Sequence, residues 1–281
     1  MSARMESASA IKELRAWIAT WRAGGARIGL VPTMGALHEG HLSLARATKE
    51  RCERVVVSIF VNPTQFAPHE DFDRYPRNLA ADKAKLNGLA DLVFTPSASE
   101  MYPKGFSTRL EVGGPSAGLE TDFRPHFFSG VATIVAKLLI AAMPDIAMFG
   151  EKDYQQLLVI RRLAADLALP VEIAGAPIHR EADGLAMSSR NAYLDAEARG
   201  IAGQLNLILK AAARRIRAGH PIGEVESAAK AALLEAGFES VDYVAVRDAA
   251  TLEPAGDLLR PARILGAAKV AGTRLIDNME V

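Results

Sequence analysis

The sequence predicts an α/β protein with a doubly wound, Rossmann-like parallel sheet, followed by a smaller α+β part. Short apolar runs rich in β-branched residues alternate with segments of helical periodicity, as parallel strands joined by helices do. Polar, glycine-containing segments follow two of these runs, at the sheet edge where open α/β sheets bind ligands. From about residue 192 the pattern changes to two long helices and two strand-like runs.

The composition is that of a globular protein with a substantial core. Of the 281 residues, 49% are hydrophobic and 23% are charged. Lys+Arg and Asp+Glu both number 33, so no net basic field favours binding to nucleic acid. The single cysteine, Cys52, excludes an intrachain disulfide and a cysteine-based zinc site, and we expect it to pack as a helix residue.

No signal-like apolar segment and no bilayer-spanning apolar run is evident in the sequence. We therefore expect a cytoplasmic protein that has neither a membrane nor a nucleic acid as partner.

Helices and strands alternate through the first 178 residues. We expect a helix over 7–23, a strand over 27–31 that Pro32 ends, and a doubly buried strand over 54–61. The further expected elements are a helix at 78–88, a strand at 91–95, an edge strand or hairpin arm at 107–114, a buried helix at 131–142, a strand at 145–149, a helix ending near 168 and a strand at 171–174.

The C-terminal part has a different order of expected elements, with two helices followed by two strands. Helices are expected at about 195–218 and 222–237, and strands at 241–248 and 262–270. We place the domain boundary near residues 176–184. Residues 1–178 are thereby assigned to the Rossmann-like domain and residues 179–281 to the α+β domain.

The stretch Val31–Leu44, VPTMGALHEGHLSL, reads as a strand end, a tight turn and the first turns of a helix. Gly35 can adopt positive φ without steric cost. His38 and His41 are three residues apart, so both lie on one face of a helix start, whose free N–H groups attract anions. Two imidazoles there suit a phosphate chain better than a metal, because Glu39 points elsewhere. The alternative is two surface histidines beside a turn.

Two later segments add groups that suit phosphate. Gly150–Asp153 follows a strand, and Lys152 can reach a phosphate as a point charge. Asp153 is expected to cap the next helix. In Met187–Arg190, two hydroxyls, backbone N–H groups and a guanidinium can surround an oxyanion. The alternative for this tetrapeptide is an ordinary surface loop.

Gln65 and Gln156 each carry an amide that both donates and accepts hydrogen bonds, which suits a small hydroxy acid. The alternative is two solvated amides. Met34, Phe60 and Phe149 are candidates for an apolar wall, although core packing is the better expectation for the two phenylalanines. The polar segment 67–77 has prolines near both ends and is long enough to act as a flap.

The sequence contains no Walker A motif, no G-x-G-x-x-G motif and no G-x-S-x-G elbow, which argues against a P-loop enzyme, a standard dinucleotide binder and an α/β-hydrolase. Instead, His38-Glu39-Gly40-His41 resembles the "HIGH" signature of nucleotidyltransferases and class I aminoacyl-tRNA synthetases. Met187–Arg190 resembles the "KMSKS" loop that accompanies that signature.

Longer strings resemble the pantoate–β-alanine ligase family, a HIGH-motif nucleotidyltransferase type. They are VPTMGALHEGHLSL, SIFVNPTQF, YPR, GEKDYQQ, DGLAMSSRN and RLIDN, in this order. The resemblance implies ATP-dependent condensation of (R)-pantoate with β-alanine to pantothenate, AMP and diphosphate through a pantoyl adenylate. It also implies Mg²⁺ and a homodimer, and it leaves the metal ligands unassigned. We expect the C-terminal domain to act as a lid that closes over the nucleotide through Ser188–Arg190.

By position, the resemblance also implies residue roles. Gln65 and Gln156 would hold pantoate, and Gln65 would border the β-alanine site. The implied catalytic residues are His38, His41, Lys152, Ser188, Ser189 and Arg190, with His41 as the proton donor. The residues implied for ATP are Met34, Gly35, Ala36, Leu37, His38, Glu39, Gly40, His41, Gly150, Glu151, Lys152, Asp153, Met187, Ser188, Ser189, Arg190 and, through its main chain, His179.

The chain departs from the family pattern at two positions: Thr64 stands where relatives often have methionine, and His179 where they usually have an apolar residue. Two other functions share part of the pattern. One is a nucleotidyltransferase that releases its adenylylated product without a ligation step. The other is a catalytically inactive nucleotide-binding regulator, against which the intact histidine, lysine and Ser-Ser-Arg positions argue.

Overall fold

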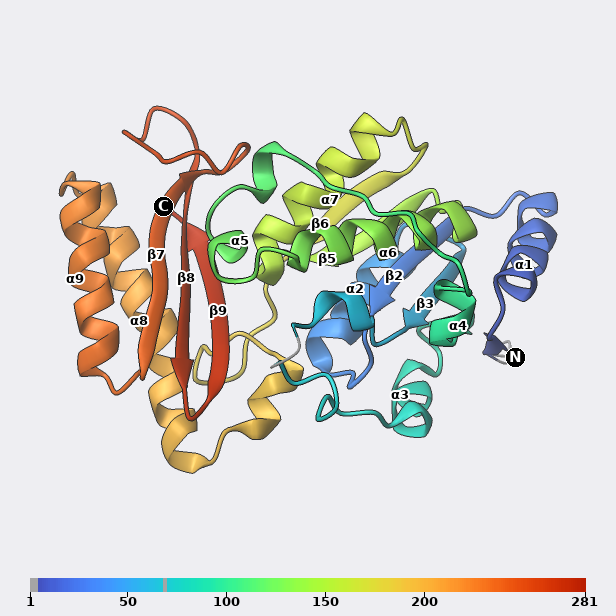
Figure 1. Cartoon of the computed structure of the whole chain (residues 1–281), viewed down its shortest axis with the longest axis horizontal. Helices are drawn as coiled ribbons and strands as arrows, with labels where there is room; N and C mark the ends of the chain where they lie inside the picture. The colour runs from blue at the N-terminus through green and yellow to red at the C-terminus, as the bar shows by residue number, and fades with distance from the viewer. Residues whose placement is uncertain (1–4, 68–69) are drawn as a thin grey trace.

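The computed structural model describes residues 5–67 and 70–281, which fold around two β-sheets (Figure 1). The larger sheet has the strand order β1-β4-β3-β2-β5-β6, and all of its neighbouring strands are parallel. The predicted Rossmann-like parallel sheet is thereby confirmed. Its strands are β1 (Glu6–Ala8), β2 (Ile28–Thr33), β3 (Arg54–Ile59), β4 (Leu92–Phe94), β5 (Ile146–Gly150) and β6 (Glu172–Ala176).

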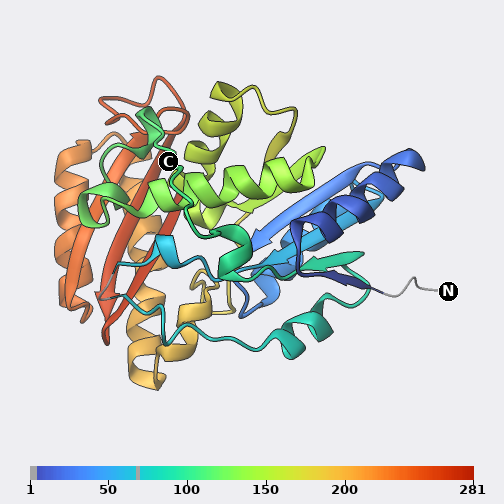
Figure 2. The same cartoon turned by 45° about the vertical axis from the view of Figure 1, so that its right-hand side comes forward.

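Helices cover both faces of this sheet, because alternate side chains of a strand point to opposite sides. Leu30 and Val56 pack with α1, α6 and α7, whereas Val31 and Val57 pack with α2 and α3. Figure 2 shows the parallel strands from a second direction. The helices are α1 (Ile11–Ala23), α2 (Glu39–Lys49), α3 (Leu79–Leu86), α4 (Ala98–Met101), α5 (Glu120–Phe123), α6 (Phe127–Ala142) and α7 (Tyr154–Asp166).

The strand order reverses between β2 and β5. From β2 the chain moves outward through β3 and β4, and it then returns to place β5 on the other side of β2. Such a switch point opens a crevice at the carboxyl ends of the two strands. Here those ends are Thr33 and Gly150. The histidine-containing turn and the Lys152 segment, which the sequence suggested for phosphate binding, therefore begin side by side.

The second sheet is antiparallel, in the order β7-β8-β9, and it confirms the predicted smaller α+β part. One face packs on α8 and α9, and Leu119 and Leu158 pack against the other (Figure 1). The sheet therefore lies between its own helices and the first part of the chain. Its elements are α8 (Ala196–Arg217), α9 (Ile222–Glu235), β7 (Ser240–Asp248), β8 (Ala262–Val270) and β9 (Thr273–Glu280).

Several expected elements are wrong or incomplete. Residues 107–113 form no strand: the N–H of Leu110 donates to Thr133 Oγ1 at 3.0 Å, and Leu110 and Val112 pack on residues of α6 and α7. Their alternating pattern comes from packing on helices and not from strand pairing. Strands β1 and β9 were not predicted, and α6 begins at Phe127, before the start at residue 131 that the sequence predicts.

Pro32 does not end its strand but lies inside β2. Successive residues of β2 bond to opposite neighbours, as the bonds of Ile28 O to Asp145 N and of Thr33 O to Phe60 N show. Pro32 therefore faces the β5 side, where pairing stops at Leu30, and its missing N–H leaves no gap in the β3 ladder.

Cys52 is buried as expected but follows the end of α2 instead of lying within it. Within residues 5–67 and 70–281, no helix combines the length and apolar character that crossing a bilayer needs.

Candidate active site

A cavity of about 780 Å³ lies over the carboxyl ends of β2 and β5 and extends to the second sheet. Its wall brings together most of the predicted site residues. These are Met34, His38, Gly40, His41, Gln65, Gly150, Lys152, Asp153, Gln156, His179, Met187, Ser188, Ser189 and Arg190. The predicted residues outside the wall are Gly35, Ala36, Leu37, Glu39 and Glu151.

The turn before α2 is held by hydrogen bonds to a side chain of α3. Gly35 adopts φ +85°, as expected, and Ala36 is held at φ +50°. The carboxylate of Asp82, which is buried in α3, accepts hydrogen bonds from Ala36 N at 2.9 Å and Leu37 N at 2.8 Å. These two amides are therefore committed to Asp82. The turn positions the histidines that follow it.

His38 and His41 lie with ring centroids 4.1 Å apart. The backbone N–H of His38 donates to His41 Nδ1 at 3.4 Å, so the proton of a neutral His41 sits on Nε2. Burial lowers the pKa of His41 to about 3, and nearby His38 and Lys152 add to the effect. Burial and Lys152 lower the pKa of His38 to about 4. Both imidazoles are thus neutral hydrogen-bonding groups at neutral pH.

One buried polar atom in this pair, Nδ1 of His38, has no hydrogen-bond partner within the described residues. A buried polar atom without a partner costs free energy, about 1–3 kcal/mol. A bound group with oxygen atoms would remove that cost. The position of this nitrogen, at the first turn of α2, is the one at which anions bind.

Lys152 lies in the 3-10 turn Glu151–Asp153, which the second sheet holds in place. The side-chain amide of Asn278 donates to the carbonyls of Glu151 and Lys152, each at 2.9 Å. Lys152 Nζ is 3.8 Å from Asp153 Oδ2. Asp153 occupies the N-cap position of α7, as expected, but its carboxylate makes no capping bond and its ψ of 60° lies outside the extended region.

The carboxylates of Glu39 and Glu151 pair with arginines and do not point at the histidines. Glu39 Oε1 pairs with Arg46 Nη1 at 2.5 Å, in agreement with the expectation that it points away from the histidines. Glu151 Oε2 lies 3.2 Å from Arg263 Nη2.

The Met187–Arg190 segment contacts the histidine turn. Ser189 Oγ donates to the carbonyl of Ala36 at 3.1 Å, and Ser188 Oγ accepts from the N–H of Arg190 at 3.3 Å. The guanidinium of Arg190 binds both oxygens of Asp71, at 2.8 and 3.0 Å. The segment is therefore part of the cavity wall, and the charge of Arg190 is compensated by a carboxylate.

Gln65 and Gln156 line the same cavity. Gln65 lies in the 3-10 turn Pro63–Gln65 after β3, where its Oε1 accepts from Asn62 Nδ2 at 2.9 Å. Phe60 and Phe149 belong to the main core, as expected, and also reach the cavity wall.

His179 also reaches the wall, and its carbonyl accepts from Met187 N at 3.0 Å. The segment proposed as a flap contributes Asp71 and Tyr75 to the wall; Pro68 and His69 lie outside the described residues.

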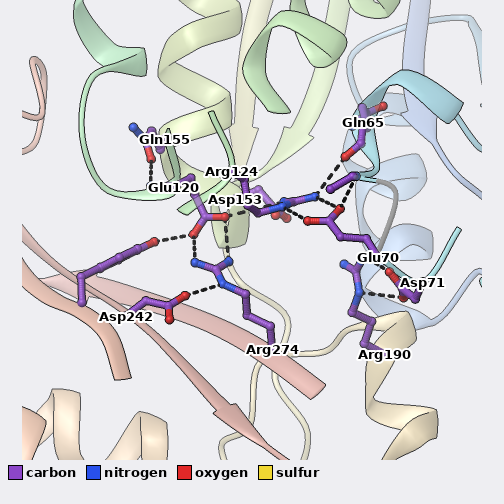
Figure 3. A network of polar contacts seen from close by, with 12 residues as sticks. Gln65, Glu70, Asp71, Glu120, Arg124, Asp153, Gln155, Arg190, Asp242 and Arg274 are labelled. Atoms are coloured by element: carbon purple, nitrogen blue, oxygen red, sulfur yellow. Dashed lines mark hydrogen bonds and ion pairs between the residues drawn. The ribbon is translucent and has the colours of Figure 1, made fainter. Parts of the chain in front are cut away.

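Charged residues that the sequence did not single out form a chain of ion pairs along the cavity (Figure 3). Glu70 pairs with Arg124 at 2.6 Å, Arg124 lies 3.7 Å from Glu120, and Glu120 pairs with Arg274 at 2.7 Å. Arg274 also binds Asp242 at 2.7 Å. Partners that lie up to 154 residues apart give no spacing signal in the sequence.

Among residues 5–67 and 70–281, no three His, Cys, Asp or Glu side chains are grouped so as to hold a metal ion.

Comparisons with known proteins place the whole chain in one family. The model of the family described as pantoate-beta-alanine ligase matches residues 6–280. The pantothenate synthetase of Mesorhizobium japonicum is 57% identical over 99% of this chain and 98% of its own, and that of Caulobacter vibrioides is 55% identical over 96% of both.

Among solved structures, pantothenate synthetase from Thermus thermophilus superposes with a TM-score of 0.92 at 45% identity, covering 98% of this chain and 99% of its own. Pantoate-beta-alanine ligase from Francisella tularensis, complexed with beta-gamma ATP and beta-alanine, gives a TM-score of 0.84 at 33% identity, covering 99% and 98%.

Proposed function

This chain belongs to the pantoate–β-alanine ligase family, and we infer that it catalyses the ATP-dependent ligation of pantoate to β-alanine. The observation that carries this inference is the convergence of His38, His41, Lys152, Gln65 and Gln156 on one cavity at the switch point of the sheet. Anion-binding groups lie beside neutral amides there. Such a site suits a nucleotide next to a small hydroxy acid.

The residues around the start of α2 are proposed to bind the phosphates of ATP. Nε2–H of His41 and the unpartnered Nδ1 of His38 are the hydrogen-bonding groups there, and Lys152 adds a positive charge. Ser188, Ser189 and Arg190 would contribute from the Met187–Arg190 segment, which contacts the same turn. Fixed donors of this kind stabilise charge that gathers on phosphate oxygens in the transition state. We propose that His179 contacts the nucleotide through its main chain.

Pantoate is proposed to bind through Gln65 and Gln156, with β-alanine beside Gln65. A carboxylate and an amine form a salt in water, so the carboxylate must first be activated. One carboxylate oxygen would attack the α-phosphorus, and the bond from that phosphorus to the bridging oxygen would break to release diphosphate. The neutral amine of β-alanine would then attack the acyl carbon, release AMP and lose a proton. The flap at 66–77 would exclude water from the adenylate.

We propose that Mg²⁺ accompanies ATP. Asp153 fits a minor role in holding it, because its carboxylate lines the cavity and is free of a capping bond. The ion would supply charge neutralisation at the phosphates when bound.

The division into residues 1–178 and 179–281, with the second part acting as a lid through Ser188–Arg190, is likewise a proposal. It is supported by the two separate sheets and their separate cores. A cytoplasmic location is proposed because the reaction consumes ATP. A homodimer is proposed from the family resemblance, and light scattering of the purified protein tests it.

The direct test is product analysis with ATP and pantoate, with and without β-alanine. We expect AMP, diphosphate and pantothenate in equal amounts only when all three substrates are present. Without β-alanine, diphosphate release should stop after about one equivalent per site. Sustained diphosphate release that ignores β-alanine would indicate a nucleotidyltransferase, and ATP binding without any turnover would indicate a regulator.

A further inference from the structure

A buried amide lies between Tyr102 and Gln65. Asn62, which is 1% exposed, has every hydrogen-bonding position of its side chain in use. Its Oδ1 accepts from Tyr102 OH at 2.7 Å and from Thr64 Oγ1 at 3.0 Å, with Thr64 N at 3.4 Å. Its Nδ2 donates to Gln65 Oε1 at 2.9 Å and to Gly130 O at 3.2 Å.

Two backbone groups fix which way this amide faces. The carbonyl of Gly130 can only accept a hydrogen bond, so it requires Nδ2 of Asn62 on its side. The N–H of Thr64 can only donate, so it requires Oδ1 on the other side. Rotating the amide by half a turn would set oxygen against oxygen and N–H against N–H. Asn62 therefore has one orientation.

That orientation decides the polarity of Gln65. Because Asn62 presents a donor, the atom of Gln65 that meets it must be the acceptor Oε1. The Nε2 group, with its two hydrogens, is then the part of the amide left for the cavity that Gln65 lines. A double donor suits the oxygen atoms of a hydroxy acid carboxylate.

The turn that carries Gln65 is seated tightly on α6. A Cβ atom added at Gly130 would lie 2.3 Å from Thr64 O and 3.1 Å from Gln65 N. The turn thus cannot shift toward α6. Tyr102 holds it from the other side: burial raises the pKa of its phenol, which stays protonated and donates to Asn62.

We propose that Tyr102 and Thr64 are positioning residues for pantoate: their hydroxyls, acting through Asn62, hold Gln65 with its NH₂ group toward the substrate. The proposal rests on the proposed role of Gln65. It assigns a role to the hydroxyl of Thr64, which lies 3.0 Å from Asn62 Oδ1 and 3.2 Å from the phenol oxygen of Tyr102.

The test compares Tyr102→Phe, Thr64→Val and the double variant in steady-state assays with each substrate varied in turn. Each single change removes one neutral hydrogen bond to Oδ1 and should raise the KM for pantoate about two- to fivefold. The double variant should raise it about tenfold or more, because only the N–H of residue 64 remains on that oxygen. The KM values for ATP and β-alanine should stay within about twofold of wild type.

Two controls separate the possible failures. Ser99→Ala changes α4, the helix that ends directly before Tyr102, but removes only a bond to Ser97, 2.9 Å away, and should leave every KM unchanged. Gln65→Ala tests the proposed role of Gln65 itself. An unchanged KM for pantoate in this variant would show that Gln65 does not bind pantoate. If Gln65→Ala weakens pantoate use but the double variant does not, the positioning proposal is wrong. Equal changes in all three KM values, with a lower Tm, would also overturn it.

Discussion

Asp71 and Arg190 form a two-point ion pair in the cavity wall, with Arg190 Nε and Nη2 at 3.0 and 2.8 Å from the two carboxylate oxygens. Arg190 is the cation that the Ser-Ser-Arg segment would offer to ATP. A planar guanidinium bound to a carboxylate in this way is satisfied much as it would be by a phosphate. In the free protein, Asp71 would therefore compete with a nucleotide phosphate for the guanidinium of Arg190.

Asp71→Asn should consequently bind ATP more tightly. The substitution removes the negative charge that offsets Arg190 while it keeps the shape of the side chain. We expect the Kd for ATP to fall about three- to tenfold, which isothermal titration calorimetry without pantoate would measure.

Glu70→Gln is the matched control for this change. Glu70 belongs to the same segment but pairs with Arg124, at 2.6 Å, so its loss should leave ATP affinity nearly unchanged. Weaker ATP binding by Asp71→Asn would instead mean that Asp71 orients Arg190 for the phosphate and does not compete with it.

The two histidines lead to a prediction about protonation. Burial lowers the pKa of His38 to about 4 and that of His41 to about 3, so neither ring should titrate between about pH 8 and 5.5 in the free protein. The negative charge of bound ATP favours the imidazolium and should raise both pKa values. NMR of protein labelled at histidine Cε1 would show both signals shifting toward the protonated form on addition of ATP near pH 6. Signals that already titrate near the usual histidine pKa of 6.5 without ATP would contradict the prediction.

The same lowered pKa values affect stability. In the unfolded chain these histidines bind protons below about pH 6.5, whereas the folded protein does not until the pH reaches 4 or lower. The free energy of unfolding should therefore fall as the pH drops through this window. His41→Gln should reduce that fall, which urea unfolding at about pH 7.5 and 5.5 would measure. Another histidine of the cavity wall, changed in His179→Gln, provides the comparison.

Local sequence spacing predicted the histidine turn, Lys152 and Ser188–Arg190, because each follows a strand or loop whose position the parallel-sheet rule supplies. Their ionic partners could not be predicted in this way. Asp71 and Arg190 are 119 residues apart, and only the complete fold brings them together. Strand β9 was missed for a related reason: Arg274 and Asp277 interrupt its apolar pattern, and both charges are compensated only by residues distant in sequence.

Lys152 has a role that can be separated from that of its turn. Its carbonyl is held by Asn278, so truncating the side chain should leave the backbone in place. Lys152→Ala should lower kcat at least about 100-fold, the range for losing a donor to a developing negative charge. His41→Ala should have an effect of the same order. Both variants should keep a Tm near that of wild type. Wild-type turnover in either variant would refute its catalytic role.

Arg274 of β9 and Glu120 of α5 join the second sheet to the first part of the chain, and breaking this pair should destabilise the fold. Glu120 is 5% exposed and receives two bonds from Arg274, at 2.7 and 2.8 Å. Burial alone would raise the pKa of Glu120, but these bonds and the charge of Arg274 hold it below its usual value. Arg274→Met leaves a buried carboxylate with only Tyr243 and Arg124 nearby. We expect a loss of about 3 kcal/mol, at the lower end for a broken buried pair, measured by urea unfolding at neutral pH.

The pair Arg162–Asp166 shows what an exposed contact contributes. Its side chains are 60% and 48% exposed, so Arg162→Met should cost no more than about 1 kcal/mol. The deficit of Arg274→Met should also shrink as the pH falls toward 4, because a protonated Glu120 no longer carries an uncompensated charge. A loss in Arg274→Met as small as that in Arg162→Met, or one that does not change with pH, would show that the ion pair does not hold the second sheet against α5.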